Sequence, residues 1–307
     1  MDTAVVDVEH FRMDFGSNTV VRDLSFEVFR GETFGFLGSN GSGKTTTIRA
    51  LLGIYYPTGG RLLIDGEPFH ADKSRTLGYL PEERGLYKKE PILDTMIYFG
   101  RLKGMSAAAA KRWSLGFLER VGLADKAKLR LDKCSGGQQQ KIQLGVTIMN
   151  SPELLILDEP TKGFDPVNRR LLLDIIAEHK QAGATVVMVT HQMEEVERLC
   201  DRILLLKDGV ARAYGSVEQV QDEFGGSTIK VRYQGSIPEG LFSYSSTPVV
   251  NDDGFGNVEL VPQPGVPTDV ILKQLIDAGV RVSAFTPSRR SLDSIFVEVY
   301  GEHPQEV

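Results

Sequence analysis

Hydrophobic and polar residues alternate with a period of two at the start of the chain. The segments "TAVVDVEHFRMDF" (residues 3–15) and "LSFEVFR" (24–30) follow this pattern, which is typical of half-buried β-strands. Three later segments are almost entirely apolar: "TFGFLG" (33–38), "ELLILDEP" (153–160) and "TVVMVTH" (185–191). Because each of them is short and is followed by a turn or a helical pattern, we predict fully buried strands.

Helical periodicity occupies the chain between these strands. "KTTTIRALLGI" (44–54) and "VNRRLLLDIIAEHKQAG" (167–183) predict single helices, and residues 92–150 predict a group of helices that forms a subdomain of its own. "RILLLKDGVARAYG" (202–215) predicts a β-hairpin with Asp208-Gly209 at its turn. Apolar strands that alternate with helices indicate an α/β fold with a mostly parallel sheet.

The character of the chain changes again after residue 222. "DEFGGS" contains the linker that we expect at residues 223–227, so that a first domain covers residues 1–222. Residues 228–307 mix strand patterns with two helical patterns, "TDVILKQLIDAGV" and "SLDSIFVEVYG", and predict a small α+β domain. Nothing in this second domain carries a recognisable chemical motif.

Composition narrows the classes of function. The 307 residues are 41% hydrophobic and 25% charged, as in ordinary globular proteins. We find no stretch of the roughly 20 apolar residues that a membrane-spanning helix needs, and no secretory signal at the N-terminus. Two cysteines, Cys134 and Cys200, do not suggest a disulfide framework, so we expect a cytoplasmic protein. With a net charge of −6 and no basic half, we expect no binding of nucleic acid.

A glycine- and serine-rich loop joins the strand at 33–38 to the helix at 44–54. Its sequence, "GSNGSGKT", fits the phosphate-binding pattern G-x-x-x-x-G-K-[ST]. Glycines let backbone N–H groups turn toward phosphate oxygens, and the helix N-terminus adds donors and the positive end of its dipole. We predict that Lys44 reaches the β- and γ-phosphates and that the Thr45 hydroxyl ligates Mg²⁺; the alternative is a plain glycine-rich connector. The nucleotide-binding residues predicted here are Gly38, Ser39, Asn40, Gly41, Ser42, Gly43, Lys44, Thr45 and Thr46.

Two carboxylates, Asp158 and Glu159, stand where the buried strand at 153–160 emerges. A carboxylate at this place can hold Mg²⁺ beside a phosphate loop, and we assign that role to Asp158. A second carboxylate can accept a proton from an attacking water molecule, and we assign that role to Glu159. An ordinary strand end before a proline turn is the alternative.

Further motifs follow in a fixed order. "SGGQ" (135–138) lies 23 residues before Asp158 and His191 lies 33 residues after it, while "KGFD" occupies 162–165. Alone, "SGGQ" would be a plain helix start and His191 an ordinary histidine at a strand end. Together with the phosphate loop and "LLILDE" (154–159), they make residues 1 to about 220 resemble the ATP-binding subunits of ATP-binding cassette (ABC) transporters.

This resemblance implies a P-loop NTPase fold of the ABC type, with a mixed β core, a helical subdomain and here a small C-terminal α+β domain. It implies ATP and Mg²⁺ as cofactors, Glu159 as general base and His191 as the contact of the γ-phosphate. By the same resemblance Phe15 stacks on adenine, and Asp165 belongs to a loop at a subunit interface. The signature residues that would contact nucleotide are Ser135, Gly136, Gly137 and Gln138.

The resemblance also implies partners. A signature loop of this family faces the phosphate loop of a second ATP-binding subunit. Two such subunits, as a homodimer or a heterodimer, would therefore meet head to tail and enclose two ATP molecules. A separate transmembrane permease would hold them at the cytoplasmic face of a membrane, near "MIYFGRLKGM" (96–105) and "ERGLYKKEP" (83–91). The chain most resembles subunits that power export.

The chain departs from the family pattern at three places. Cys134 replaces the usual leucine before the signature serine, and we expect it to pack as a small apolar residue. Lys162 and Phe164 replace small and leucine-type residues. Glu82, in "GYLPEERGLY" (78–87), replaces a glutamine; we predict that its carboxylate ligates Mg²⁺, and Glu83 and Arg84 either face the partner or form a solvated turn.

Two other functions compete with transport. A soluble ABC-type ATPase of DNA repair would carry long coiled coils between the phosphate loop and the signature, and one of translation would carry two cassettes; this chain has neither feature. A non-hydrolysing regulatory module is disfavoured because Glu159 and His191 are both present.

Overall fold

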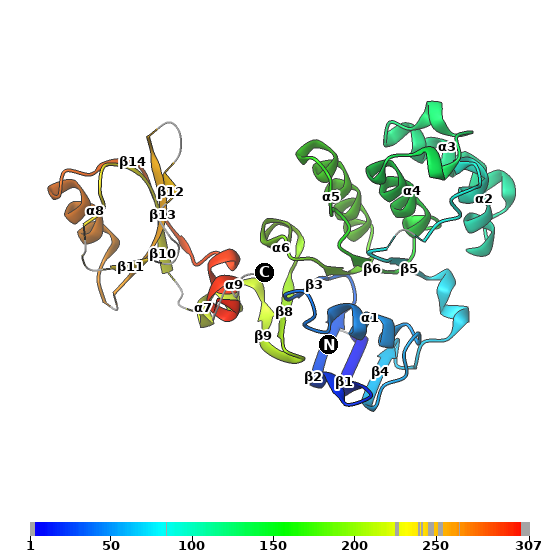
Figure 1. Ribbon diagram of the computed structural model, residues 1–307, viewed down its shortest axis with the longest axis horizontal. Coiled ribbons are helices and arrows are strands. Elements are labelled where there is room, and N and C mark those ends of the chain that lie inside the picture. Colours follow the sequence, from blue (N-terminus) through cyan, green and yellow to red (C-terminus); the bar gives the residue numbers. More distant parts are fainter. Residues whose placement is uncertain are drawn as a thin grey trace. The chain divides into compact units, whose positions relative to one another are not determined.

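The chain divides into two units, residues 1–214 and 215–307, in the computed structural model of the protein (Figure 1). This division lies N-terminal to the linker expected at residues 223–227. The structure describes residues 4–83, 85–224, 227–238, 240, 242–244, 249–250, 254–263 and 265–301. Arg84, for which the sequence left two roles open, lies outside these residues.

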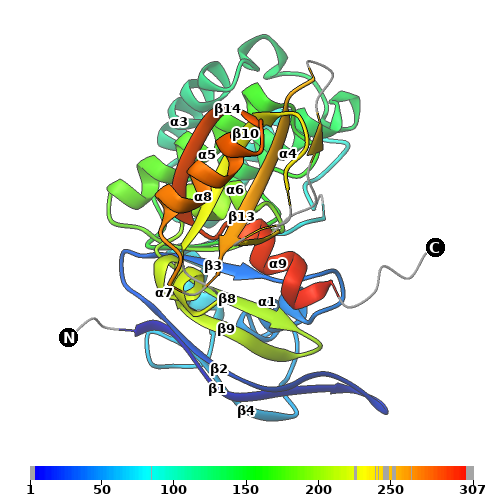
Figure 2. The same cartoon turned by 90° about the vertical axis from the view of Figure 1, so that its left-hand side faces the viewer.

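The first unit is built on a nine-stranded sheet with the order β4-β1-β2-β9-β8-β3-β7-β6-β5. At one end, β1 pairs antiparallel with β2 and β4, and Figure 2 shows these three strands side by side. β3, β5, β6, β7 and β8 pair in parallel. The sheet is therefore mixed, as the resemblance implied, and its central strands are parallel, as the alternation of strands and helices predicted. The strands are β1 (Ala4–Phe15), β2 (Asn18–Phe29), β3 (Thr33–Leu37), β4 (Gly59–Ile64), β5 (Leu77–Leu80), β6 (Leu154–Asp158), β7 (Thr185–Val189), β8 (Arg202–Lys207) and β9 (Val210–Ser216).

The central strands end at a common edge of the sheet, where the candidate site residues lie. β3, β6 and β7 are buried at every position, as their apolar runs predicted. Because parallel strands share a direction, the loops that follow their carboxyl ends meet at one edge of the sheet. Three helices follow these strands: α1 (Lys44–Leu51), α5 (Pro166–Gln181) and α6 (Met193–Leu199). The predicted hairpin is present, with Asp208 and Gly209 at φ 53° and 73° between β8 and β9.

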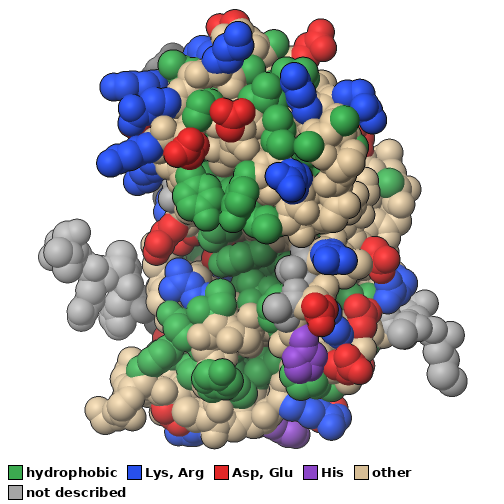
Figure 3. All heavy atoms as spheres, turned by 90° about the vertical axis from the view of Figure 1, so that its right-hand side faces the viewer, with side chains coloured by type: hydrophobic (Ala, Val, Ile, Leu, Met, Phe, Trp, Pro, Cys, Tyr) green, Lys and Arg blue, Asp and Glu red, His purple; other side chains and the backbone are tan. Residues whose placement is uncertain are grey.

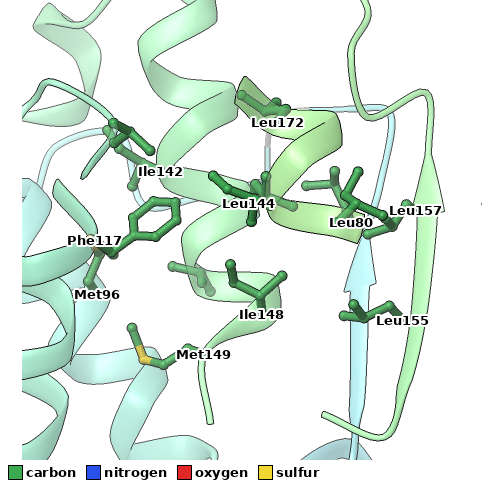
Figure 4. Packing of buried hydrophobic residues seen from close by; sticks show 14 of the residues in the cluster. Leu80, Met96, Phe117, Ile142, Leu144, Ile148, Met149, Leu155, Leu157 and Leu172 are labelled. Carbon is green, nitrogen blue, oxygen red and sulfur yellow. The ribbon is translucent and has the colours of Figure 1, made fainter. Parts of the chain in front are cut away.

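The predicted helical subdomain contains α2 (Ile92–Leu102), α3 (Ala107–Arg120) and α4 (Gly136–Ile148). α4 joins this group to the sheet, since its apolar residues pack on both sides (Figure 4). Met96 and Phe117 contact one side of it, and Leu80, Leu155 and Leu157 of β5 and β6 belong to the same core on the other. Short 3₁₀ segments, at Ala71–Arg75, Ala124–Lys126 and Leu131–Lys133, complete the unit.

The second unit pairs a small sheet with helices, as the sequence predicted. Its sheet has the order β11-β13-β10-β14, with β12 paired to β13, and Ile229, Val231 and Leu260 form a core with Ile271 and Leu275 of α8. Its elements are α7 (Val217–Glu223), β10 (Ser227–Gln234), β11 (Phe242–Tyr244), β12 (Val249–Val250), β13 (Gly256–Pro262), α8 (Thr268–Asp277), β14 (Arg281–Arg289) and α9 (Leu292–Tyr300). α7 and the short strands β11 and β12 did not emerge from the sequence.

Candidate functional site

The phosphate-binding pattern forms a curled loop between β3 and α1. Lys44 is buried, and its Nζ donates hydrogen bonds of 2.8 Å to the carbonyl oxygens of Gly38 and Ser39. Gly43 has a φ of 109°, and a Cβ at that position would lie 2.9 Å from Val21 Cγ2, so glycine is required there twice over. The loop thus wraps around the ammonium group and directs the N-terminus of α1 toward the same space.

Burial lowers the pKa of Lys44, and the carboxylates of Glu159, Asp158 and Glu82 oppose that shift. Acidic side chains at the end of β6 and in the loops after β5 and β6 therefore act on the ammonium group. A lysine that has lost most of its water and is surrounded by carbonyl oxygens can exchange those partners for phosphate oxygens.

Thr45 and Asp158 are also brought together. The Thr45 hydroxyl donates a 3.2 Å hydrogen bond to Asp158 Oδ2, and Asp158 is 1% exposed. Burial raises the pKa of Asp158 to about 6, a shift that the hydrogen bond from Thr45 opposes. A hydroxyl and a carboxylate are hard oxygen donors, and Mg²⁺ at phosphate sites takes only one or two protein ligands of this kind. The donor set fits the predicted metal.

Glu159 and His191 meet across the ends of β6 and β7. His191 Nδ1 lies 2.8 Å from Glu159 Oε1, and the backbone N–H of Glu159 donates to the Val189 carbonyl at 2.8 Å. Glu159 has a φ of 50°, a left-handed conformation that costs a non-glycine residue on the order of 1 kcal/mol. This backbone turn directs a mostly buried carboxylate away from the strand and into contact with the histidine ring.

The predicted adenine contact, Phe15, is half exposed at the end of β1. Its ring meets Tyr55 edge-on, with 5.4 Å between the ring centroids, and the Tyr55 hydroxyl accepts a 3.2 Å hydrogen bond from Arg49 Nη1. Tyr55 did not emerge from the sequence, although the run "IYYP" (54–57) puts two aromatic residues shortly after α1. Together, the rings of Phe15 and Tyr55 offer an aromatic surface beside the turn between β1 and β2.

The signature residues form the start of α4. Ser135 is its N-cap: its Oγ accepts from the Gln138 N–H at 3.4 Å, while its own N–H donates to Gln138 Oε1 at 3.1 Å. Gly136 and Gly137 occupy the first turn, where backbone N–H groups carry the positive end of the helix dipole. Cys134 packs in the apolar core, as predicted, and burial raises the pKa of its thiol.

Asp165 likewise caps a helix. Its Oδ1 accepts 3.0 Å hydrogen bonds from the backbone N–H groups of Val167 and Asn168 at the start of α5, and these bonds lower the pKa of the carboxyl. Its neighbour Lys162 makes an ion pair of 2.6 Å with Glu82. Glu83 has an almost fully exposed side chain that lies 3.6 Å from Arg49. The structure thus gives Glu82 a basic partner that the sequence did not indicate.

A buried glutamate behind the site was also missed. Glu195 on α6 is 1% exposed and accepts hydrogen bonds from the hydroxyls of Thr161, at 2.5 Å, and Thr190, at 3.5 Å. These threonines stand in the loops after β6 and β7, so Glu195 connects the loop of Asp165 to the loop of His191. Burial raises the pKa of Glu195. In the sequence it is one of two adjacent glutamates on a short helix and is indistinguishable from a solvated residue.

Glu195→Ala is expected to lower the free energy of unfolding by about 2 kcal/mol, because two buried hydroxyl groups lose their acceptor. Urea denaturation of the full chain measures this loss. The matched control is Glu194→Ala, an exposed neighbour on α6, for which a change within about 0.5 kcal/mol is expected. Equal losses in the two variants would contradict the linking role of Glu195.

Comparison with known proteins shows the family and the fold to which this chain is similar. Residues 21–162 match the family "ABC transporter", and residues 215–300 match "ATP-binding protein DrrA1-3-like, C-terminal domain". An uncharacterized ABC transporter ATP-binding protein of Methanocaldococcus jannaschii is 42% identical over 70% of this chain and 79% of its own length. A Nod factor export ATP-binding protein I of Rhizobium sp. (strain N33) is 33% identical over the whole of both chains. A solved structure titled "Structure of ATP binding subunit of ABC transporter" covers 72% of this chain and 93% of its own, with 28% identity and a TM-score of 0.67.

The fold and the matches define an ATP-hydrolysing P-loop protein. The chain belongs to the family of ABC transporter ATP-binding proteins, as its motifs indicated. Members of this family bind ATP and are ATPases, and their place in a transporter implies a transmembrane partner and dimerisation. Within the described part of this chain, no helix has both the length and the apolar character that crossing a bilayer takes.

Proposed function

We propose that this chain powers export through a separate transmembrane permease, with two copies closing head to tail around ATP. The observation that carries the proposal is the meeting of Lys44, Thr45, Asp158, Glu159 and His191 at the ends of β3, β6 and β7. The name of the Rhizobium relative, a Nod factor export protein, supports the direction of transport.

In the proposed reaction, Glu159 accepts a proton from a water molecule while the oxygen of that water attacks the γ-phosphorus. The new bond joins the water oxygen to phosphorus, and the bond from phosphorus to the ADP oxygen breaks. His191 holds the Glu159 carboxylate in place through the 2.8 Å contact, and Lys44 gives up carbonyl partners to neutralise the phosphate oxygens. Thr45 and Asp158 would hold Mg²⁺, which would supply positive charge to stabilise the negative charge that develops on the leaving ADP oxygen.

In the proposed dimer, the start of α4 in one copy faces the phosphate loop of the other. The Ser135 hydroxyl and the N–H groups of Gly136, Gly137 and Gln138 then point toward the γ-phosphate that Lys44 of the second copy holds. Asp165, which fixes the start of α5, would keep the loop at 162–165 in shape for the same contact. Hydrolysis removes the shared phosphate, and the dimer loosens.

An exposed group of aromatic side chains supports a membrane partner. Tyr87 packs against Tyr98 and Phe99, with ring centroids 5.7 and 5.9 Å apart, and Leu102 follows Tyr98 by one helical turn. We call these four residues the aromatic patch. Tyr87, Tyr98 and Leu102 are each about half exposed. Figure 3 shows hydrophobic side chains gathered on the side of the molecule where α2 and α3 lie, with charged side chains around them. Such a surface is typical of a protein–protein interface.

Membrane fractionation tests the proposal. The tagged full chain, expressed in its own host, is expected to sediment with membranes and to co-purify with a protein that has several membrane spans. Tyr98→Ser with Leu102→Ser should release it while ATPase activity of the purified chain persists. The control is Ile276→Ser, an exposed hydrophobic residue of α8 outside the aromatic patch. Unchanged sedimentation of the double variant would contradict docking at the patch.

A further inference from the structure

Glu82 and Lys162 form an ion pair between two loops of the nucleotide site. Lys162 Nζ lies 2.6 Å from Glu82 Oε1, and both side chains are about half exposed. The loops follow β5 and β6, which are parallel neighbours with Leu80 opposite Leu157. Glu82 and Lys162, two residues that depart from the family pattern and are distant in the sequence, thus contact each other in the structure.

The same two loops are fixed by α4. Gln143 Nε2 donates to the carbonyl oxygens of Pro81, at 3.3 Å, and Glu83, at 3.1 Å, so that it holds the backbone on both sides of Glu82. Gln140, one turn earlier, donates to the Pro160 carbonyl at 3.5 Å. Both glutamines are buried. The backbone positions from which Glu82 and Lys162 reach each other are therefore set by the helix that begins at the signature residues.

The negative charge of the site explains why Glu82 needs a basic partner. Asp158 and Glu159 already place two carboxylates beside the phosphate loop, and the Glu82 carboxylate acts on both Asp158 and Lys44. A third unpaired carboxylate would repel the first two and would attract a cation. Lys162 supplies that cation from the protein itself, with its Nζ 2.6 Å from Glu82 Oε1. A neutral glutamine at position 82 would need no such partner.

We propose that Lys162 is a positioning residue that holds the Glu82 carboxylate in an ionic link between the two loops, so that Glu82 does not ligate Mg²⁺. The proposal deepens the proposed ATPase site and rests on it for the position of the metal. It replaces the metal role that the sequence suggested for Glu82 and leaves Thr45 and Asp158 as the protein donors. The link also ties the loop of Asp165 to the loop that leads into the helical subdomain.

Four proteins test the link: the natural chain, Lys162→Met, Glu82→Gln and the double variant. Binding of a fluorescent ATP analogue is followed as Mg²⁺ is added. Lys162→Met should lower the Mg²⁺ concentration at half-maximal binding about two- to fivefold, because the released carboxylate attracts the cation. In the Glu82→Gln background, Lys162→Met should shift the Mg²⁺ concentration at half-maximal binding by less than half of the shift in the natural chain. Lys162→Arg should behave as the natural chain, and high salt should shrink the shift.

Two outcomes overturn the proposal. If Lys162→Met gives the same shift in both backgrounds, the two side chains are not coupled. If Glu82→Gln alone raises the Mg²⁺ requirement more than Lys162→Met lowers it, Glu82 ligates the metal. The matched control is Arg61→Met, which breaks a comparably exposed ion pair with Glu9 and should leave the Mg²⁺ titration unchanged.

Urea unfolding without nucleotide separates this proposal from the proposed function. Lys162→Met should lower the unfolding midpoint of the natural chain by more than that of Glu82→Gln, because only the natural chain loses an ion pair. Equal changes in both backgrounds would contradict the link. Absence of ATP hydrolysis in the natural chain would count against the ATPase site alone, since the unfolding cycle needs no nucleotide.

Discussion

Glu159→Gln is expected to slow ATP turnover by about 10²- to 10⁴-fold, because the amide cannot accept the proton of the attacking water. ATP affinity should be nearly unchanged, since Lys44 and Thr45 remain in place and the amide oxygen can still contact His191. With hydrolysis blocked, two copies should stay closed around ATP. Phosphate release under saturating ATP measures turnover, and gel filtration with and without ATP measures dimerisation.

Glu194→Gln is the control for this variant, because it makes the same chemical change on an exposed position of α6. It should retain full activity and remain monomeric to the same extent as the natural chain. Full ATPase activity in Glu159→Gln would remove Glu159 from the role of general base. Loss of ATP binding in that variant would instead show that the left-handed turn at residue 159 depends on the carboxylate.

The main elements of the first unit could be predicted because their patterns are local. The strands β3, β6 and β7 are runs of apolar residues, and the phosphate loop has a spacing that few other structures require. The roles proposed for Asp158 and Glu159 rest on their place at a strand end. Their contacts with Thr45 and His191 join residues that are far apart in the chain. The sequence assigned all four residues to one nucleotide site, but it did not predict these two contacts.

Other features were missed because their signals are weak or lie only in space. α7 begins with a capping box, in which Ser216 and Gln219 bond each other's backbone N–H groups, but its seven residues are too short for helical periodicity to show. β11 and β12 have three and two residues and no pattern at all. Lys162 is 80 positions from Glu82, and the local sequence around either residue does not predict an ion pair between them.

Asp158→Asn is expected to stabilise the nucleotide-free protein at neutral pH while it weakens the binding of Mg²⁺ with ATP. Burial raises the pKa of Asp158 from its usual 3.8 to about 6, so the folded protein takes up a proton between these pH values that the unfolded chain does not hold. The stability that this group contributes is therefore present below about pH 4, falls as the pH rises toward 6, and stays lost above it. Asparagine carries no charge, and its side-chain oxygen can still accept from Thr45.

The expected gain for Asp158→Asn at about pH 7.5 is about 2 kcal/mol in the free energy of unfolding, and it should shrink toward zero near pH 4. Urea denaturation at both pH values measures it, with Asp125→Asn as the control at an exposed position. A gain of the same size at both pH values would mean that the charge of Asp158 is not its origin, and a loss at neutral pH would contradict the burial argument. If the gain appears together with weaker Mg²⁺-dependent binding of ATP, the folded chain keeps an unfavourable buried carboxylate at this strand end because the metal needs it there.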